Sequence, residues 1–438
     1  MVPFVPLLSE EDPAVSSEGA IDPLGLYTIA DALGSRLAPG VRERQSRPRW
    51  LTAIAAGMVL CEDFPEDAVA RDEISEPWQV FEWYVVEGLV RTATDGDDLT
   101  RLPGLRKARQ AVADRVPLSA SRYLKAPSVY GFHGVYRTLA REIGLDSAGR
   151  LGEHGLRVVE TWAEEQGLRG FFGTMSGPGR SVRDQLRAAI ADGLKEGAVA
   201  RKPGWSGWEL FRNHFAPANP GPKEAAAIAE GILNDEQGYR GEAMRALQAR
   251  EREIEWRSSG DERAFHLSLR ETASEPLRRL VDAILAYDAW GRLLTDAFTD
   301  CLALMTQTRK RTSPSALARQ PNVRRAHDRV AESFEKAYRQ LEPFETETLR
   351  FQQSFAELAE KCPVDEWVQR LLGHHERVQR GKPPYGKNAF FARFDDGSAV
   401  VRPGYLTHEG GRGDEQYVHQ YRTWPLWTFA RDLQMLGS

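Results

Sequence analysis

The stretch EPLRRLVDAILAYDAWGRLLTDAFTDCLALM, residues 275–305, decides the fold class of this chain. Its apolar residues recur at spacings of three and four along its whole length, which is the pattern of one face of a long α-helix. Residues 322–342, 344–361 and 363–379 repeat this pattern with short polar breaks between them. Because short connections favour antiparallel neighbours, residues 223–380 are predicted to form a helical bundle.

The C-terminal region, residues 381–438, departs from the helical pattern. Residues 389–405, AFFARFDDGSAVVRPGY, contain two strand-like runs around the Asp-Asp-Gly turn at 395–397. Such a turn between alternating apolar residues is typical of a β-hairpin. Residues 423–436, TWPLWTFARDLQML, are expected to form a closing helix.

On the N-terminal side, residues 1–116 are predicted to form a separate helical region. Residues 47–61, RPRWLTAIAAGMVLC, contain a nearly all-apolar helix, which we expect to be buried. Residues 76–90, EPWQVFEWYVVEGLV, form a further predicted helix with its aromatic residues in the core. The proline-rich segment PANPGP, residues 217–222, is the clearest linker signal in the chain.

Residues 117–216 have the element order of a winged helix-turn-helix domain. A predicted helix at 130–145 is followed by a turn, by a second helix within 150–167, and by the Gly-rich stretch 167–179. Helix, turn, helix and a Gly-rich hairpin make a winged helix. RLGEHGLRVVETW also resembles the strand-into-helix passage of winged-helix regulators. The predicted fold is therefore mainly α and multi-domain, with a winged-helix region, a helical bundle and a small C-terminal β-hairpin.

Composition limits the class of protein. The chain has 438 residues, a net charge of −5, 41% hydrophobic residues and 28% charged residues, a balance typical of a soluble globular protein. No apolar run is long enough to cross a bilayer, and the N-terminus lacks a basic signal-peptide region. The three cysteines lie far apart, which argues against a disulfide framework and leaves too few thiols for a structural zinc site. We expect a cytoplasmic protein with no membrane partner.

Positive charge is concentrated in two runs, although the chain as a whole is acidic. Residues 42–49 carry four arginines against one glutamate, and residues 309–329 carry seven Lys or Arg against one aspartate. The second run contains prolines and serines that place much of it in loops or at helix N-termini, where backbone N–H groups and arginines are expected to converge on an anion. The alternative is that each run is a solvated helix face or loop. The candidate nucleic-acid-binding residues are Arg42, Arg44, Arg47, Arg49, Arg309, Lys310, Arg311, Arg319, Arg324 and Arg325.

The sequence carries no known catalytic motif. A P-loop, a dinucleotide-binding GxGxxG after a strand, a GxSxG elbow and an HExxH helix are all missing. Asp296 and Asp300 are spaced for one helix face, but a bundle metal site also needs His or Glu from another helix. His374 and His375 lie near a helix C-terminus, where positive charge is stabilised. We therefore assign no catalytic residue, cofactor or metal, and enzyme activity stays open although its absence is the preferred interpretation.

Three passages resemble a helix-rich prokaryotic family of uncharacterised proteins, often encoded beside helicases and nucleases in phage-defence gene clusters. The passages are YTIADALGSRLAPGVRERQSRPRWLTAIAAG (27–57), ILAYDAWGRLLTDAFTDCL (284–302), and the C-terminal hairpin followed by YVHQYRTWPLWTFARDL (417–433). This resemblance implies membership of a multi-subunit antiviral defence apparatus and implies no particular reaction.

The leading functional hypothesis is a non-catalytic subunit of a prokaryotic antiviral defence complex. It would bind DNA, or bridge DNA-acting partners such as a helicase or nuclease, through the winged-helix region and residues 309–329. Its helical body would serve as a scaffold. A protein-protein adaptor without direct DNA contact is the first alternative. A divergent metal-dependent nuclease is the second.

Overall fold

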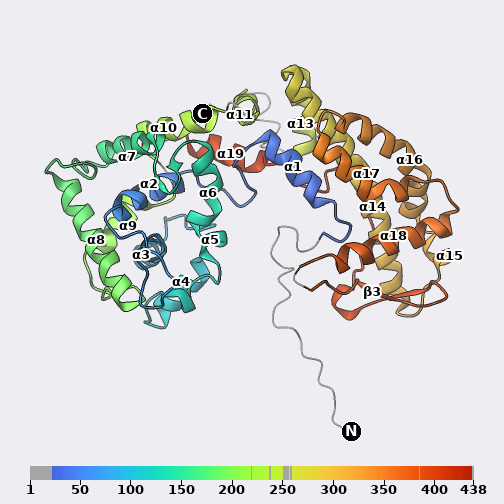
Figure 1. The fold of residues 1–438 in the computed structure, drawn as a ribbon, viewed down its shortest axis with the longest axis horizontal. Helices are drawn as coiled ribbons and strands as arrows, with labels where there is room; N and C mark the ends of the chain where they lie inside the picture. Colours follow the sequence, from blue (N-terminus) through green and yellow to red (C-terminus); the bar gives the residue numbers. More distant parts are fainter. Residues whose placement is uncertain are drawn as a thin grey trace, which may run out of the picture. The chain divides into compact units, whose positions relative to one another are not determined.

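The computed structural model describes residues 22–218, 220–235, 238–249, 256, 259–383 and 385–436 (Figure 1). The first 21 residues of the predicted N-terminal region lie outside this part of the chain. The described residues form eighteen α-helices and two small two-stranded sheets. The prediction of a mainly helical protein with a small C-terminal β-hairpin is confirmed.

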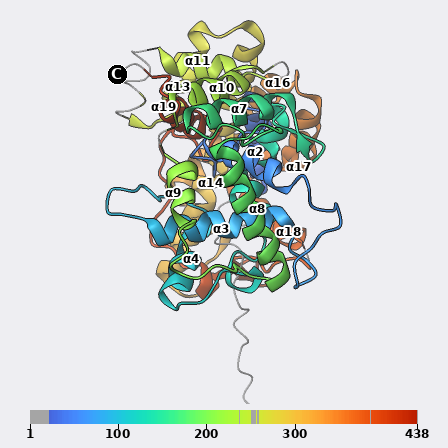
Figure 2. The same ribbon diagram turned by 90° about the vertical axis from the view of Figure 1, so that its left-hand side faces the viewer.

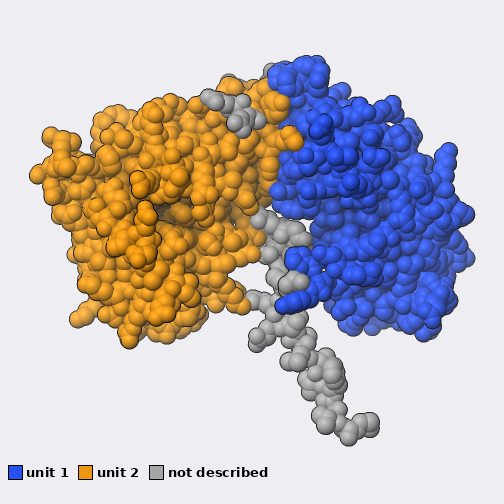
Figure 3. Space-filling model, viewed as in Figure 1, with its two compact units in different colours: residues 1–34, 261–421 blue, residues 35–260, 422–438 orange. Residues whose placement is uncertain are grey.

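The chain divides into two compact units, each built from two separate stretches of sequence (Figure 3). Unit 1 comprises residues 1–34 and 261–421, and unit 2 comprises residues 35–260 and 422–438. The predicted bundle at 223–380 is thus divided between the two units after Gly260.

Unit 1 is organised around one long helix, α14 (Glu275–Thr308), which is buried on most of its circumference. Trp290 lies at its centre, with ring centroids 4.8 Å from those of Phe351 and of Phe355. The apolar spacing of three and four along α14 thus correctly predicted a core helix. The surrounding helices are α13 (Glu262–Thr272), α15 (Pro314–Leu317), α16 (Pro321–Leu341), α17 (Glu345–Ala359) and α18 (Val364–Arg380).

A hairpin closes unit 1 beside the C-terminal half of α14. Strands β3 (Phe391–Arg393) and β4 (Ala399–Val401) pair antiparallel, and a short 3-10 helix at Pro403–Tyr405 follows them. Gly397 in the turn has φ +75°, a conformation that favours glycine, as the Asp-Asp-Gly sequence predicts. The first helix, α1 (Tyr27–Leu37), starts in this unit.

Unit 2 is built around α2 (Trp50–Cys61), whose residues are almost all buried, as its apolar sequence predicts. The Trp50 ring stacks on Phe132 at 4.7 Å between centroids. Figure 2 shows α8 (Pro178–Glu196) running across α3 (Pro77–Thr92) beside α2. The remaining elements of the unit are α4 (Leu105–Ala113), a 3-10 helix at Ala120–Arg122, α5 (Pro127–Tyr130), α9 (Trp208–Phe215), α10 (Pro222–Leu233), α11 (Arg240–Gln248) and α19 (Thr423–Asp432).

The region predicted as a winged helix has its helices in the expected order. Its hairpin lies between the two helices, however, and not after the second one, where a wing is expected. Helix α6 (Phe132–Glu142) is followed by the strands β1 (Asp146–Ser147) and β2 (Arg150–Leu151) and then by α7 (Glu153–Glu165). The Gly-rich residues after α7 form turns and bends without strand pairing. The glycines there bring backbone close to backbone, since a Cβ on Gly179 would lie 1.9 Å from the Leu168 carbonyl oxygen. The winged-helix prediction is therefore not confirmed.

The segment predicted as a linker lies inside unit 2. Arg49 donates hydrogen bonds from its Nη1 to the carbonyl oxygens of Ala216 (2.6 Å) and Ala218 (3.3 Å). Helix α10, which follows the segment, packs against α7. A proline-rich sequence is typical of an extended backbone. Here the buried Arg49 side chain binds carbonyl oxygens of that backbone, so the segment is part of the unit and not a linker. Among the described helices, none is long and apolar enough to cross a membrane.

Candidate nucleic-acid interface

The first basic run, residues 42–49, lies in unit 2, where Arg49 is buried and Arg47 is largely buried. The Nε of Arg49 is 3.0 Å from Oε1 of Glu224, whose side chain has no exposed area. Thr52 donates a hydrogen bond to the same oxygen (2.8 Å). This ion pair neutralises Arg49 inside the core, so its charge does not reach a ligand.

Arg47 is neutralised in the same way. Its guanidinium forms ion pairs with Asp432 (2.8 Å) and with Asp98. Burial lowers the pKa of Arg47, but these two carboxylates outweigh it and leave the pKa raised. The other two members of the run lie nearer the surface, because Arg42 is exposed and the Arg44 guanidinium is stacked 4.9 Å from the Tyr130 ring.

The second basic run, residues 309–329, lies in unit 1 and is mostly exposed. None of its seven cations forms a salt bridge with a carboxylate in the described part of the chain. The exposed members are Arg309, Lys310, Arg311, Arg319, Arg324 and Arg329. The two runs look alike in sequence, but among the described residues the second presents six exposed cations to solvent and the first presents Arg42.

The hairpin positions the first part of this run. Thr312 and Ala399 exchange two backbone hydrogen bonds (2.9 and 3.0 Å), which places residues 309–311 along β4. The Arg311 guanidinium lies 3.6 Å from the centroid of the Phe394 ring. Such a cation–π contact keeps the charge while fixing the side chain on the surface.

Helix α16 positions the rest of the run. Val323 and Ala326 are buried, which turns Arg324 and Arg329 to solvent. Arg325 is half-buried and donates a hydrogen bond to the Gly413 carbonyl oxygen (2.6 Å).

The expectation that free backbone N–H groups add to this surface is wrong at the start of α16. Asp300 of α14 accepts hydrogen bonds from the backbone N–H of Asn322 (3.0 Å) and from its side chain (3.2 Å). Ser313 caps α15 by accepting from Ala316 N–H. Side chains of the protein itself therefore satisfy these donors, and the arginines alone face outward.

The buried carboxylates of α14 hold the C-terminal segment of unit 1 in place. Asp296 accepts from the backbone N–H groups of Arg412 and Gly413 (3.2 and 3.1 Å). Asp288 accepts from the N–H of Val418 (2.6 Å) and lies 3.1 Å from Nδ1 of His419. The two carboxylates considered for a metal site, Asp296 and Asp300, thus both accept hydrogen bonds from backbone amides.

The paired histidines are also structural, and burial lowers the pKa of both. His375 Nε2 accepts a hydrogen bond from Phe390 N–H (3.0 Å), so Nδ1 carries the proton and donates to the Pro23 carbonyl oxygen (2.7 Å). His374 is 2.8 Å from the Leu24 carbonyl oxygen. Burial lowers the pKa of His375 to about 4. The expected stabilisation by positive histidines at the end of α18 is therefore wrong.

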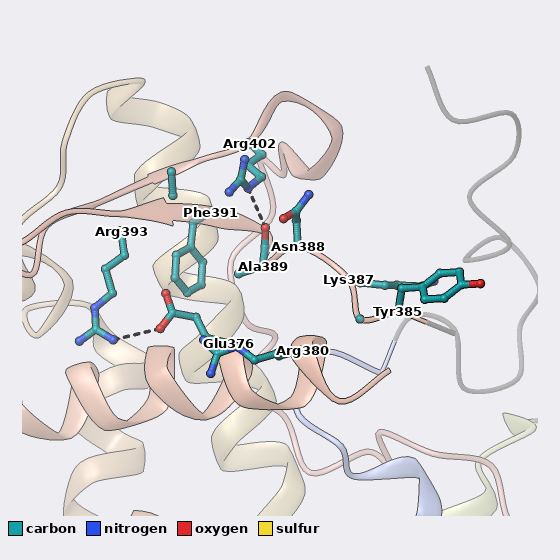
Figure 4. A pocket seen from close by; sticks show the side chains of 11 residues that line it. Glu376, Arg380, Tyr385, Lys387, Asn388, Ala389, Phe391, Arg393 and Arg402 are labelled. Carbon is teal, nitrogen blue, oxygen red and sulfur yellow. Dashed lines mark hydrogen bonds and ion pairs between the residues drawn. The ribbon is translucent and has the colours of Figure 1, made fainter. Parts of the chain in front are cut away.

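A cavity of about 460 Å³ lies between the end of α18 and the hairpin (Figure 4). It is lined by Arg380, Lys387, Arg393 and Arg402, and Glu376 is the one carboxylate among the described lining residues. The carboxylate is paired with Arg393 at 3.3 Å, and Arg402 donates to the Ala389 carbonyl oxygen (2.9 Å). The cavity extends the positive character of the hairpin. Among the described residues, no group of three His, Cys, Asp or Glu is placed to hold a metal ion.

One positive cluster was missed at the sequence level. Residues 101–109, RLPGLRKAR, carry four cations and no acid. These cations surround a cavity beside α4 in unit 2. The signal was present in the sequence as an acid-free run of nine residues, with as many cations as residues 42–49.

Comparison with known protein families, with curated proteins and with solved structures found no match to this chain. The function is therefore argued from the surface itself.

Proposed function

We propose that this protein is a non-catalytic DNA-binding subunit that contacts DNA phosphates through the exposed cations of residues 309–329. A single observation carries the proposal: six cations of this segment are exposed, and none is paired with a carboxylate in the described structure. Exposed arginines bind phosphate oxygens with two parallel hydrogen bonds and need little rearrangement to do so.

The surface has the chemistry of backbone contact, not of base recognition. Its cations come from a loop along β4, from the α15–α16 turn and from one face of α16. Contacts of this kind position a protein on DNA without reading sequence. Release of counterions by about six phosphate contacts gives a slope of about −5 in log K against log salt for duplex DNA.

Charge reversal on α16 tests the proposal. We expect R324E/R329E to weaken binding of a labelled DNA duplex by about tenfold or more at about 50 mM salt and to flatten the salt slope by about 2. Fluorescence anisotropy over a salt series measures both quantities.

The same helix supplies a matched control. Lys336 and Arg339 are exposed on α16 and lie C-terminal to the basic segment. K336E/R339E makes an equal change in net charge and should leave binding within about twofold of wild type. Equal weakening by both variants, or no binding of duplex or single-stranded DNA by wild type, would contradict the proposal and favour the adaptor alternative.

The setting in an antiviral defence complex is proposed from the sequence resemblance alone. The identity of adjacent genes tests it, since a helicase or nuclease gene beside this one is the expected result. Contact with DNA by residues 117–216 is not required by the proposal, because the exposed cations that carry it lie in unit 1.

A further inference from the structure

A second concentration of positive charge lies in unit 2, around a cavity of about 690 Å³ beside α4. Four cations and no carboxylate are found among the described residues that line it. The four are Arg101, Arg106, Lys107 and Arg109, and each is exposed. The volume is within the range of small-molecule sites.

The start of α4 packs closely against the core of unit 2. Gly104 precedes the helix with φ +74°, and a Cβ there would lie 2.1 Å from the Tyr123 ring. The Tyr123 hydroxyl donates a hydrogen bond to the buried Glu82 carboxylate (2.8 Å). Ala108 and Ala111 form the buried face of the helix. The cations therefore project from a fixed platform, which is what a preformed site requires.

The charges on α4 are unfavourable for the helix itself. Arg106 and Lys107 are in its first turn, where no acidic residue is present and where the helix dipole favours negative charge. Arg106 and Arg109 are three residues apart, so two like charges share one face. None of these three side chains has an ion pair in the described part of the chain. A bound anion would relieve both repulsions.

The lining of the cavity also contains apolar side chains. Leu102 is buried, and Leu105 and Leu124 are half-buried. A single small anion would leave these leucines uncovered, whereas a ligand with several negative charges and a planar or apolar part would cover them. We propose that the cavity binds a phosphorylated ligand of nucleotide size, with its phosphoryl groups held by the four cations and its base resting on the leucines.

Arg101, one of the four cations that line the cavity, also contacts an aromatic side chain. Its guanidinium lies 5.6 Å from the ring centroid of Trp424, which is 36% exposed. An arginine held by a ring keeps its charge available to a phosphate. Movement of Arg101 toward a ligand would change the surroundings of this indole.

The ligand has two possible sources, a free nucleotide or the backbone of a nucleic acid, and both present the same phosphoryl groups. We test them with ATP and with a short single-stranded DNA oligonucleotide, and adenosine serves as the probe that lacks phosphate. ATP, but not adenosine, should raise the melting temperature of wild type and bind it in calorimetry. The charge-reversal variant R106E/R109E should weaken ATP binding by about tenfold or more.

The control R169E/K195E makes the same change in net charge at two exposed cations of unit 2 outside the cavity. It should bind ATP as wild type does. The oligonucleotide is measured in the R324E/R329E background, so that the surface in unit 1 does not mask the result. Competition of the oligonucleotide with ATP would identify nucleic acid as a source, and ATP binding without competition would identify the free nucleotide.

The inference is overturned if neither probe binds wild type at about 50 mM salt, or if R106E/R109E and the control weaken binding equally. The two proposed sites use different residues in different units. A negative result for the cavity of unit 2 therefore does not contradict DNA binding by unit 1, and the reverse also holds. ATP binding lost in R106E/R109E and kept in R324E/R329E would support the cavity even if DNA binding were absent.

Discussion

At the scale of single residues, buried charges determine where the loops of unit 2 lie. Arg49 pairs with Glu224 in the core and also donates to the carbonyl oxygen of Ala216. Removing one partner of such a pair leaves the other charge buried and uncompensated, which costs more than the pair contributes. The consequence is that the backbone at Ala216 and Ala218 depends on a side chain far away in sequence.

We predict that Arg49→Met lowers the free energy of unfolding by about 3–5 kcal/mol, because Glu224 is then left charged and buried. Urea denaturation monitored by circular dichroism measures the change. The matched control is Arg42→Met, an exposed arginine of the same run, which should change stability by less than about 0.5 kcal/mol. Similar losses in the two variants would contradict the buried-pair assignment.

A second prediction at this scale concerns pH. Burial, with the nearby Lys382 and His374, lowers the pKa of His375 to about 4, while an unfolded histidine titrates near 6.5. Between these values the unfolded state binds more protons, so the free energy of unfolding falls as the pH falls from about 6.5 to about 4. The loss attributable to His375 is about 3 kcal/mol at most.

The variant His375→Gln isolates this contribution. It should be less stable than wild type at neutral pH, because the hydrogen bonds to Pro23 and Phe390 are weakened. Its stability should also fall less steeply between pH 6.5 and 4, as measured by urea denaturation at several pH values. An unchanged slope would show that His375 already carries a proton in the folded protein.

At the scale of elements, the charges in the first turn of α4 are expected to lower the stability of that helix. Its first turn contains Arg106 and Lys107 and no acidic residue, the reverse of what the helix dipole favours. Helix α8 has the favourable arrangement, with Lys195 in its last turn. The cations of α4 therefore oppose the helix dipole, and the proposed binding of phosphoryl groups would offset this repulsion.

We predict that Arg106→Glu raises the free energy of unfolding by about 0.3–1 kcal/mol in low-salt buffer without phosphate. The reverse is expected for Lys195→Glu, which places negative charge at the end of a helix and should lower stability by a similar amount. Thermal denaturation of both variants measures the two signs. A loss of stability in Arg106→Glu would mean that Arg106 supports the helix through a structural contact.

At the scale of the whole molecule, two cores are built from interrupted stretches of one chain. Unit 2 is completed by α19, whose Phe429 is buried and stacks against Tyr136 at 6.4 Å. Unit 1 has Trp290 at the centre of α14. Each unit thus has its own central aromatic residues.

Reciprocal substitutions test whether the units respond separately. We predict that Phe429→Ala speeds hydrogen exchange of α2 amides and leaves α14 amides unchanged, and that Trp290→Ala does the opposite. Each substitution removes a large buried side chain and costs about 3–5 kcal/mol in its own unit. Equal acceleration in both helices would show that the two units unfold as one.

Elements with strong local signals could be predicted from the sequence. The apolar spacing of residues 275–305 predicted α14, and the Asp-Asp-Gly turn predicted β3 and β4, because both depend on periodicity and turn chemistry within a few residues. The winged helix was predicted from element order alone. Order does not determine whether a Gly-rich stretch pairs as strands, since pairing depends on neighbours in space.

The charge runs mark the limit of sequence reasoning. The order of residues in the sequence by itself determined that positive charge is concentrated at 42–49 and at 309–329. Only the tertiary structure decided that Arg49 is neutralised by a carboxylate 175 residues away and Arg47 by one 385 residues away, while Arg324 stays exposed. The physical reason is that a charge is available to a ligand only if it is exposed and not paired with an opposite charge. Both conditions are set by which distant segments the fold brings together.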